Sequence, residues 1–286
     1  MTDNDYDVVA HLSLERLEDN LFRGDSRDIG TQRVFGGQVL GQALRAAAAT
    51  VDGRQVHSLH AYFLREGDHG APIVYEVDRS RDGRSFSARR VVAIQHGAPI
   101  FTLSSSFQVP EPGLEHQSPM PDVPPPEDLS DVLELNARAL ASAPPKLQRF
   151  ASVSAPFDFR PVEQVVLDNP GAQKPWKNVW IKSRQQLPDE RGLHVAMLAY
   201  VSDYGLLSTA LLPHGADMFS GRLQIASIDH AMWFHRDFRM DEWLLYSCTS
   251  LSTSGARGLA RGFVFRRSGE LVATAVQEGL MREVRR

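Results

Sequence analysis

Tyr62-Phe63-Leu64-Arg65 returns later in the chain as Trp233-Phe234-His235-Arg236. Each copy leads through a stretch with serine and arginine to a glycine turn and a final apolar strand. The turn glycines, Gly97 and Gly269, lie 32 and 33 residues after the arginine that ends each copy. Two such copies predict one supersecondary unit built twice, so that the copies bury a shared face. Chance similarity between two antiparallel meanders is the alternative.

The composition is that of a globular protein with an ample core. The chain has 286 residues, of which 42% are apolar, and its net charge is −4. Nucleic-acid and anionic-membrane binders need a basic surface, so neither class is expected. The acidic N-terminal stretch has no apolar signal core, and we find no run of 18 apolar residues, which argues against secretion and a membrane span. The single cysteine, Cys248, cannot form an internal disulfide, which favours the reducing cytoplasm.

The first unit, residues 1–109, reads as a helix followed by an antiparallel meander. An amphipathic segment, Val8 to Phe22, comes first, and a stretch rich in alanine and leucine then predicts a helix from Gln38 to Val51. Turn residues separate four expected strands: His57–Arg65, Ile73–Arg79, Ser85–Gln95 and Pro99–Val109. A helix cradled by such a sheet is the simplest way to bury both apolar faces.

A proline-rich stretch separates the two units. Seven prolines lie from Pro110 to Pro126 and predict a semi-rigid extended linker, after which a helix is expected from Pro126 to Ala141. We therefore divide the chain into residues 1–109, 110–150 and 151–286. The second unit has a long helix candidate, Glu190 to about Leu212, and six expected strands: Phe157–Val162, Trp176–Leu187, Leu223–Phe234, Glu242–Ser250, Arg257–Arg266 and Leu271–Arg282.

Asp203 lies in an apolar run that predicts a buried helix. A carboxylate in such a helix is costly to desolvate unless partners hold it. It could orient or deprotonate a water molecule, or Ser202 or Asp203 could cap the helix at a break before Gly205. Spacing alone does not choose between these interpretations.

Longer motifs extend the repeat into a resemblance that spans about Leu14 to Met281. They are Phe35–Ala43, His57–Arg65, Asp82–Arg90, Leu198–Asp203, Ala226–Arg236 and Val276–Gly279. In this order they resemble the type II acyl-CoA thioesterases, the double hot-dog enzymes. The resemblance implies an α+β fold in which two long helices are each wrapped by antiparallel sheet, and in which the two units form an intrachain pseudo-dimer.

The resemblance also implies that Asp203, Ser227 and Gln277 are catalytic. The family commonly has threonine where this chain has Ser227, so the hydroxyl is retained and a methyl group is lost. A hydroxyl and an amide can hold one water molecule toward a carbonyl carbon, beside a carboxylate that activates it. On composition alone, a serine and a glutamine on strands are usually ordinary polar residues.

Substrate-binding candidates follow from the same motifs. Gly36 and Gly37 would let the backbone turn closely into the next helix, whose N-terminal amides could face an anion or a carbonyl group. Arg84 and Arg89 belong to a basic cluster that could bind the phosphates of coenzyme A, although solvated strand faces explain most such clusters. His57 could line an acyl pocket, although structural histidines are more common.

The first unit lacks the catalytic set. Ser105 occupies the position of Gln277, and Gln38 and Gln42 stand where a carboxylate would be expected. An amide cannot serve as a general base, so we expect the cleft of the first unit to be inert.

No cofactor and no metal are expected. Asp229 and His230 point to opposite faces of a strand, and neither a zinc motif nor a Gly-x-Ser-x-Gly elbow is present. The prediction is a cytoplasmic thioesterase that hydrolyses fatty acyl-CoA without a covalent intermediate and forms a homodimer or homotetramer. The alternatives are a hot-dog enoyl-CoA hydratase and a non-catalytic acyl-CoA binding protein. The hydratase pattern Asp-x₄-His fails here, because five residues separate Asp229 from His235.

Overall fold

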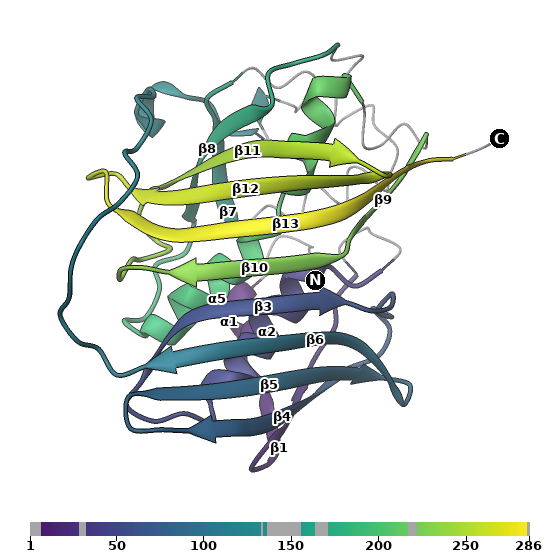
Figure 1. Cartoon of the computed structure of the whole chain (residues 1–286), viewed down its shortest axis with the longest axis vertical. Coiled ribbons are helices and arrows are strands. Elements are labelled where there is room, and N and C mark those ends of the chain that lie inside the picture. Colours follow the sequence, from purple (N-terminus) through teal and green to yellow (C-terminus); the bar gives the residue numbers. More distant parts are fainter. Residues whose placement is uncertain are drawn as a thin grey trace.

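The computed structural model describes residues 7–28, 33–132, 134–135, 156–163, 171–216 and 222–284. These residues form one antiparallel sheet of 13 strands, and the main helices, α2 (Gly36–Ala48) and α5 (Arg191–Ser202), lie behind it in Figure 1. The two helices touch through their backbones. A Cβ atom on Gly37 would lie 2.1 Å from the carbonyl oxygen of Tyr200.

The strand order mirrors itself about one central pair, β3 (Gln55–Phe63) and β10 (Asp229–Phe234). These strands run antiparallel, with Tyr62 opposite Asp229 and Ser58 opposite Trp233. Outward from β3 lie β6 (Ala98–Gln108), β5 (Phe86–Gln95), β4 (Ile73–Asp82), β2 (Leu21–Gly24) and β1 (Glu15–Glu18). Outward from β10 lie β13 (Leu271–Glu283), β12 (Arg257–Arg266), β11 (Leu244–Ser254), β8 (Trp176–Ser183) and β7 (Phe157–Pro161), and β9 (Leu223–Ser227) pairs with the far end of β13.

The sequence repeat is also a repeat of hydrogen bonds. The backbone N–H groups of Arg65 and the residue before it both donate to the carbonyl oxygen of Ile100, and those of Arg236 and its predecessor both donate to Val272. Each arginine side chain then donates to the carbonyl group one residue earlier, at 2.6 and 3.0 Å. Shared contacts of this detail argue against chance similarity.

The elements expected in the first half are present, with their ends displaced by at most three residues. The exception is the segment Val8 to Phe22, which is not one amphipathic element. It forms a short helix, α1 (Val8–Leu12), whose N-terminus is capped by Asp7, and then the hairpin of β1 and β2. All four residues of β1 are exposed, because Glu15–Glu18 has too few apolar residues to cover the core.

The helix predicted from Glu190 to Leu212 was too long. α5 ends at Ser202, and a 3₁₀ helix, η2 (Leu207–His214), follows it. Gly205 lies between them with φ +72°, a left-handed conformation that ends an α-helix. The apolar pattern continues through the break, so Arg191–His214 is long and apolar enough for a membrane span, but most of it is buried inside the protein.

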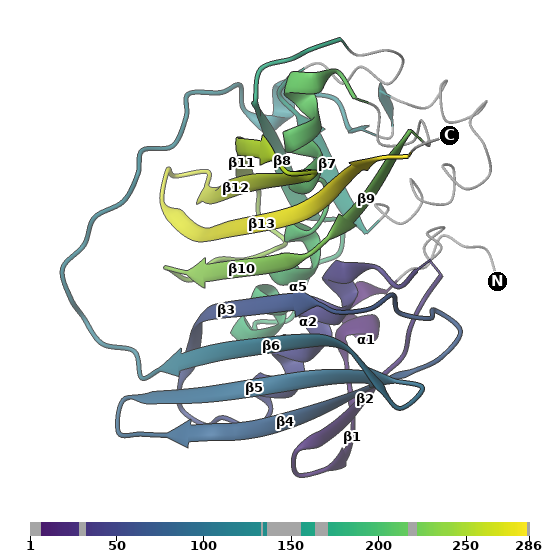
Figure 2. The ribbon, with the colours of Figure 1, turned by 45° about the vertical axis from the view of Figure 1, so that its right-hand side comes forward.

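The linker runs past the ends of the central strands to reach the second half, as Figure 2 shows. The indole Nε1 of Trp180 donates to the carbonyl oxygen of Pro124 at 2.9 Å, and the backbone N–H of Leu271 donates to Gln117. The helix expected from Pro126 begins with one 3₁₀ turn, η1 (Pro126–Asp128). Leu129, which follows this turn, is extended, so the described part of the range is not one continuous helix; residues 133 and 136–141 of it lie outside the described residues.

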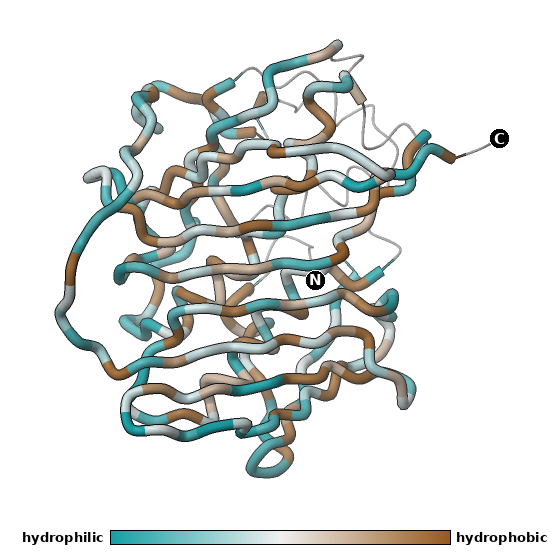
Figure 3. The backbone as a smooth tube through the Cα atoms, in the orientation of Figure 1, coloured by the Kyte–Doolittle hydropathy of each residue, from teal (hydrophilic) through white to brown (hydrophobic). Residues whose placement is uncertain are grey.

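One apolar core joins both halves. Polar and apolar residues alternate along the strands (Figure 3), and the inward side chains pack on the helices. Leu40 and Leu59 of the first half share this core with Leu198 and Met232 of the second, and all four are fully buried. Separating the halves would expose this surface to water, so the halves stabilise each other.

Candidate active site

Three polar side chains from three elements meet at the C-terminal end of α5. Asp203 is the C-cap residue of that helix, Ser227 ends β9, and Gln277 lies in β13. The Gln277 Nε2 donates to Asp203 Oδ1 at 2.5 Å and to Ser227 Oγ at 2.9 Å. Ser227 Oγ donates to Asp203 Oδ1 at 3.3 Å. Each side chain therefore fixes the other two.

Strand register brings Ser227 and Gln277 together across 50 residues of sequence. Ser227 lies opposite Gly279, and Gln277 is two residues away on the same side of β13. The chain then bends, because the predicted single strand Leu223–Phe234 is interrupted at Ile228 and changes from β9 to β10. The backbone N–H of Ile228 donates to the carbonyl oxygen of Glu278 at 3.0 Å, which holds the bend against β13.

The other half of the chain supplies a third contact to the carboxylate. The backbone N–H of Gly37, in the first turn of α2, donates to Asp203. A Cβ atom on Gly36 would lie 2.7 Å from Asp203 Oδ2 and 2.9 Å from the ring of Phe63. The absence of a side chain at Gly36 leaves room for both groups, and the positive end of the α2 dipole faces the carboxylate.

The electrostatics of Asp203 are those of a base held in a largely dry site. Burial raises the pKa of its carboxyl group above the ordinary value, while hydrogen bonds from Gln277, Gly37 and Ser227 act in the opposite direction. The residue still keeps a partial opening to solvent. A carboxylate with a raised pKa and a fixed orientation can accept a proton from a bound water molecule.

Three aromatic rings lie beside the cluster. Phe35 and Tyr204 lie with ring centroids 4.8 Å apart, Phe63 lies beside Gly36, and all three are partly exposed. This role has no signal in the sequence, since aromatic residues at these positions look like ordinary core. Such a rim excludes water and strengthens the electrostatic interactions inside it.

His57 and Arg84 lie at the opposite end of β3. His57 Nε2 is 2.8 Å from Ser106 Oγ, and Arg84 is exposed in the turn between β4 and β5. The cluster of Asp203, Ser227 and Gln277 adjoins the other end of the strand, where the N–H of Phe63 donates to the carbonyl oxygen of Ile228 at 2.9 Å. Six residues of strand, roughly 20 Å, separate His57 from that end. The structure therefore does not bring these two candidates to the carboxylate.

Arg89 lies in β5, level with Leu59 in the middle of β3, and its side chain is only 2% exposed. Its Nε donates to Thr50 Oγ1 at 2.8 Å, and its Nη2 donates to the carbonyl oxygen of Thr50 and to Asp82 Oδ1. Its Nη1 donates to the carbonyl oxygens of Arg81 and Ala88. All five N–H groups have acceptors within the chain, so this geometry favours a structural role over coenzyme A binding.

Two further features lie outside the cluster. Among the residues that the structure describes, no three His, Cys, Asp or Glu side chains gather as metal ligands would.

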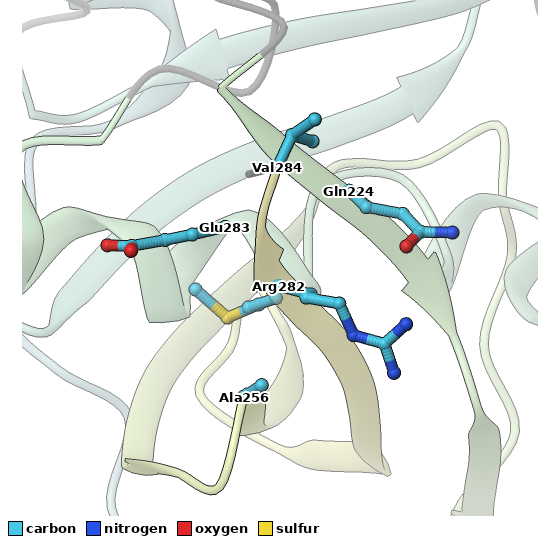
Figure 4. Close-up of a pocket in the computed structure, with 6 residues that line it drawn as sticks. Gln224, Ala256, Arg282, Glu283 and Val284 are labelled. Carbon is cyan, nitrogen blue, oxygen red and sulfur yellow. The ribbon is translucent and has the colours of Figure 1, made fainter. Parts of the chain in front are cut away.

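A surface hollow of about 860 Å³ lies over the ends of β9 and β13 (Figure 4). It is lined by Gln224, Ala256, Met281, Arg282, Glu283 and Val284, and contains none of the three catalytic candidates.

Known proteins that are similar to this chain show which family it belongs to. Residues 153–280 match the model of the family described as acyl-CoA thioesterase, and residues 23–108 match its N-terminal domain. The chain is 42% identical to human Acyl-coenzyme A thioesterase 8 over 285 residues, which cover 96% of this chain and 88% of that one. The chain belongs to the acyl-CoA thioesterase family. The resemblance found in the sequence is confirmed, and this thioesterase hydrolyses the thioester bond of acyl-CoA.

Other relatives agree over almost the whole thioesterase chain. Acyl-CoA thioesterase 2 of Haemophilus influenzae is 41% identical over 286 residues, 99% of each chain. The crystal structure of the acyl-CoA thioesterase II TesB2 from Mycobacterium marinum is 44% identical, superposes with a TM-score of 0.81, and covers 97% of this chain and 99% of that one. A protein from Alicyclobacillus acidocaldarius described as having a hot-dog fold shares the fold, with a TM-score of 0.79 at 21% identity.

Proposed function

We propose that this thioesterase hydrolyses fatty acyl-CoA by direct attack of a water molecule that Asp203 activates. The observation that carries the proposal is the Asp203 carboxylate, oriented by Gln277, Ser227 and the Gly37 N–H inside an aromatic rim. Asp203 accepts a proton from water as the new C–O bond forms at the thioester carbonyl carbon. The C–S bond then breaks, and the proton passes to the departing thiolate, which leaves a free fatty acid and coenzyme A.

No covalent intermediate is needed. A thioester carbonyl is electrophilic and a thiolate leaves readily, so positioned water suffices. Cys248 is buried, and burial raises the pKa of its thiol to about 12, which removes it as a nucleophile. Ser227 Oγ is paired directly with a carboxylate rather than with a histidine that could accept its proton.

The N-terminus of α2 is the part of the site suited to the negative charge on the carbonyl oxygen. Backbone amides in the first turn of a helix lack intrahelical acceptors and point outward. The N–H of Gly37 already donates to Asp203, so within this turn the N–H of Gly36 is the donor that we assign to the thioester oxygen. Donors that are fixed before the reaction stabilise the developing oxyanion without reorganising.

Release of free thiol from a panel of saturated acyl-CoA substrates tests this proposal and gives the chain-length preference. A hydratase would release no thiol, and a binding protein would retain the substrate unchanged. The contacts of Asp229 and His235, the two residues considered for a hydratase, support hydrolysis instead. Asp229 Oδ1 accepts the N–H of Glu278 at 2.8 Å, whereas His235 lies beyond the other end of β10 and pairs with Thr274 at 2.9 Å.

We further propose that the chain is an intrachain pseudo-dimer of two hot-dog units with one working site. Ala49 caps α2 where Asp203 caps α5. Arg89 lies opposite Ser105 in the first unit, and Ala260 lies opposite Gln277 in the second. In the first unit, the Arg89 guanidinium therefore occupies the place that corresponds to the proposed active site of the second unit. There it donates to Thr50, just after α2 ends.

Gln38 and Gln42 do not lie at the position in the first unit that corresponds to Asp203, contrary to the expectation from the sequence. Asp203 follows the last turn of its helix, so its counterpart is Ala49, whereas both glutamines lie in the first two turns of α2. Gln42 is structural: its Nε2 donates to the carbonyl oxygen of His11 at 2.7 Å, and its Oε1 accepts the hydroxyl of Tyr75 at 2.7 Å.

Ser105→Ala should leave kcat within a few-fold of wild type. Ser105 lies beside Arg89 at the place in the first unit that corresponds to the proposed site, and its buried hydroxyl has no hydrogen-bond partner among the described residues. Active-site titration should give one functional site per chain. The matched control is Gln277→Ala, at the corresponding position of β13, where kcat should fall. Two titratable sites per chain would contradict the proposal.

The proposed division remains 1–109, 110–150 and 151–286. The two family models match residues 23–108 and 153–280, on either side of the linker, which supports these boundaries. A cytoplasmic location rests on the single reduced Cys248, which is buried and free.

A homodimer or homotetramer is the expected assembly. The outward face of the central strands carries the aromatic rings of His60 and Trp233, 5.2 Å apart, and Tyr62, which is 56% exposed. Exposed aromatic residues are enriched where subunits meet. Analytical ultracentrifugation at micromolar concentration should give a mass of two or four chains, and the mass of one chain would refute the expectation.

A further inference from the structure

A buried polar pair lies directly behind Asp203. His230 of β10 has no exposed surface, and its Nε2 is 2.9 Å from the Oγ of Ser202, the last residue of α5. The same hydroxyl donates to the carbonyl oxygen of Ala199 at 2.9 Å. A hydroxyl has only one proton, so in this arrangement the ring Nε2–H donates to Ser202 Oγ. The pair joins the end of the helix to the sheet.

Tyr246 of β11 makes a second tie to the same residue. Its hydroxyl donates to the backbone carbonyl oxygen of Ser202 at 3.1 Å, and its ring is buried. The last carbonyl groups of a helix receive no hydrogen bond from within the helix. A buried carbonyl group left without a donor would destabilise the fold. Ser202 is therefore held through its side chain and its backbone, by two different strands.

These ties bear on the catalytic cluster because of where they sit in the chain. Asp203 directly follows Ser202, and Ser227 lies three residues before His230. The His230–Ser202 bond thus spans from the segment that carries Ser227 to the helix end that carries Asp203. The contacts across that gap are 2.5 Å from Gln277 and 3.3 Å from Ser227 to one carboxylate oxygen, so a small movement of the helix end would break them.

We propose that His230 is a positioning residue for thioester hydrolysis, which acts through Ser202 to set the place of Asp203 against Ser227 and Gln277. The inference rests on the proposed role of Asp203. Burial lowers the pKa of His230 to about 3, so the ring is neutral at neutral pH and serves as a hydrogen-bond donor. Misplacement by about 1 Å in an active site can cost up to about 100-fold in rate.

His230→Phe tests the proposal, since it keeps an aromatic ring and removes both nitrogens. We expect kcat to fall about tenfold or more while KM changes by less than about twofold, because only the placement of the base is altered. The melting temperature should hardly fall, since the substitution also removes ring Nδ1, which is buried without a partner among the described residues. A purely structural histidine would show the reverse pattern. His230→Gln, whose amide N–H can reach the same hydroxyl, should recover most of kcat.

His194→Phe is the matched control. His194 lies near the other end of α5, is 2% exposed, and accepts the backbone N–H of Met240 on Nδ1 at 3.1 Å. That substitution should lower the melting temperature, because it leaves a buried N–H unpaired, and should leave kcat unchanged. Ser202→Ala, which removes only the hydroxyl, should reproduce the kcat loss of His230→Phe, and the double variant should lose no more than either single one.

An unchanged kcat in both His230→Phe and Ser202→Ala would overturn the positioning role, as would an equal loss in His194→Phe. Asp203→Asn in the same assay separates this outcome from failure of the site itself. If Asp203→Asn retains full activity, the proposed base is wrong and the positioning role falls with it. If Asp203→Asn is inactive and His230→Phe is not, the base stands and only the positioning role is lost.

Discussion

Asp203→Asn should lower kcat by roughly two orders of magnitude or more, the usual loss when a general base is removed. The amide keeps the shape of the side chain and can still accept a hydrogen bond from Gln277, so folding should be intact. In the wild-type enzyme, kcat should fall as the pH drops through the raised pKa of Asp203, because a protonated carboxyl group cannot accept the proton of water. Steady-state thiol release across pH measures both effects, and wild-type activity in a well-folded Asn variant would remove the assignment.

The same substitution has a consequence for stability with a definite sign. Because burial raises the pKa of Asp203, the native state holds its proton more firmly than the unfolded chain does. That contribution to stability is complete below the unfolded pKa and is lost as pH rises through the folded pKa. Asn does not ionise, so the variant should be at least as stable as wild type at neutral pH, with the difference shrinking in acid. Melting temperatures of wild type and Asp203→Asn, measured at neutral pH and in acid, check this.

Ser227→Ala and Gln277→Ala complete the series. Each should lower kcat by less than Asp203→Asn, because the base remains. Their double variant should lose less than the sum of the single effects, since both side chains hold one carboxylate and one another. Clean additivity of the two losses would argue for independent roles.

Gly37→Ala should have the second largest effect, on activity and stability together. The new methyl carbon would lie 2.1 Å from the carbonyl oxygen of Tyr200 and 2.5 Å from the ring of Phe35. A backbone oxygen on a packed helix cannot turn aside, so α2 and α5 must separate, and overpacking of this kind costs about 1–3 kcal/mol. The separation also withdraws the N–H that Asp203 accepts, so we expect kcat to fall by about tenfold or more.

The measurements are the urea midpoint and kcat of Gly37→Ala beside a neutral glycine substitution. Gly113→Ala provides it, because a Cβ atom at Gly113 in the linker would have no neighbour within 4 Å. That control should match wild type in both readouts. A Gly37→Ala enzyme with normal kcat and an unchanged midpoint would mean that the close helix crossing is dispensable.

The strands were predictable because their signals are local. Alternating side chains and turn glycines mark β3 to β6 within three residues, and the repeat of Tyr62–Arg65 in Trp233–Arg236 anticipated the shared hydrogen bonds of the two halves. The length of α5 was not predictable in this way. Its apolar pattern runs on past Gly205, and only the backbone conformation shows that the α-helix has already ended.

The site was harder to predict, because its members meet through tertiary contacts. The pattern around Asp203 left a helix cap and a catalytic base as equal alternatives, and the structure places the residue as a C-cap that is also the centre of a polar cluster. Only family resemblance pointed to Ser227 and Gln277, since register across 50 residues has no local signature. A buried arginine such as Arg89 and a phosphate-binding arginine also look alike in sequence.

The central pair of β3 and β10 carries a consequence for how the enzyme responds to concentration. The site takes its carboxylate from one half and the Gly37 amide from the other, and the two strands meet within a single polypeptide. If the halves were separate molecules, dilution would dissociate them and dissolve the site with them. Covalent connection replaces that encounter with an intramolecular one, at an effective concentration set by the linker. On the proposed assignment of the site, each chain therefore keeps it complete at any dilution.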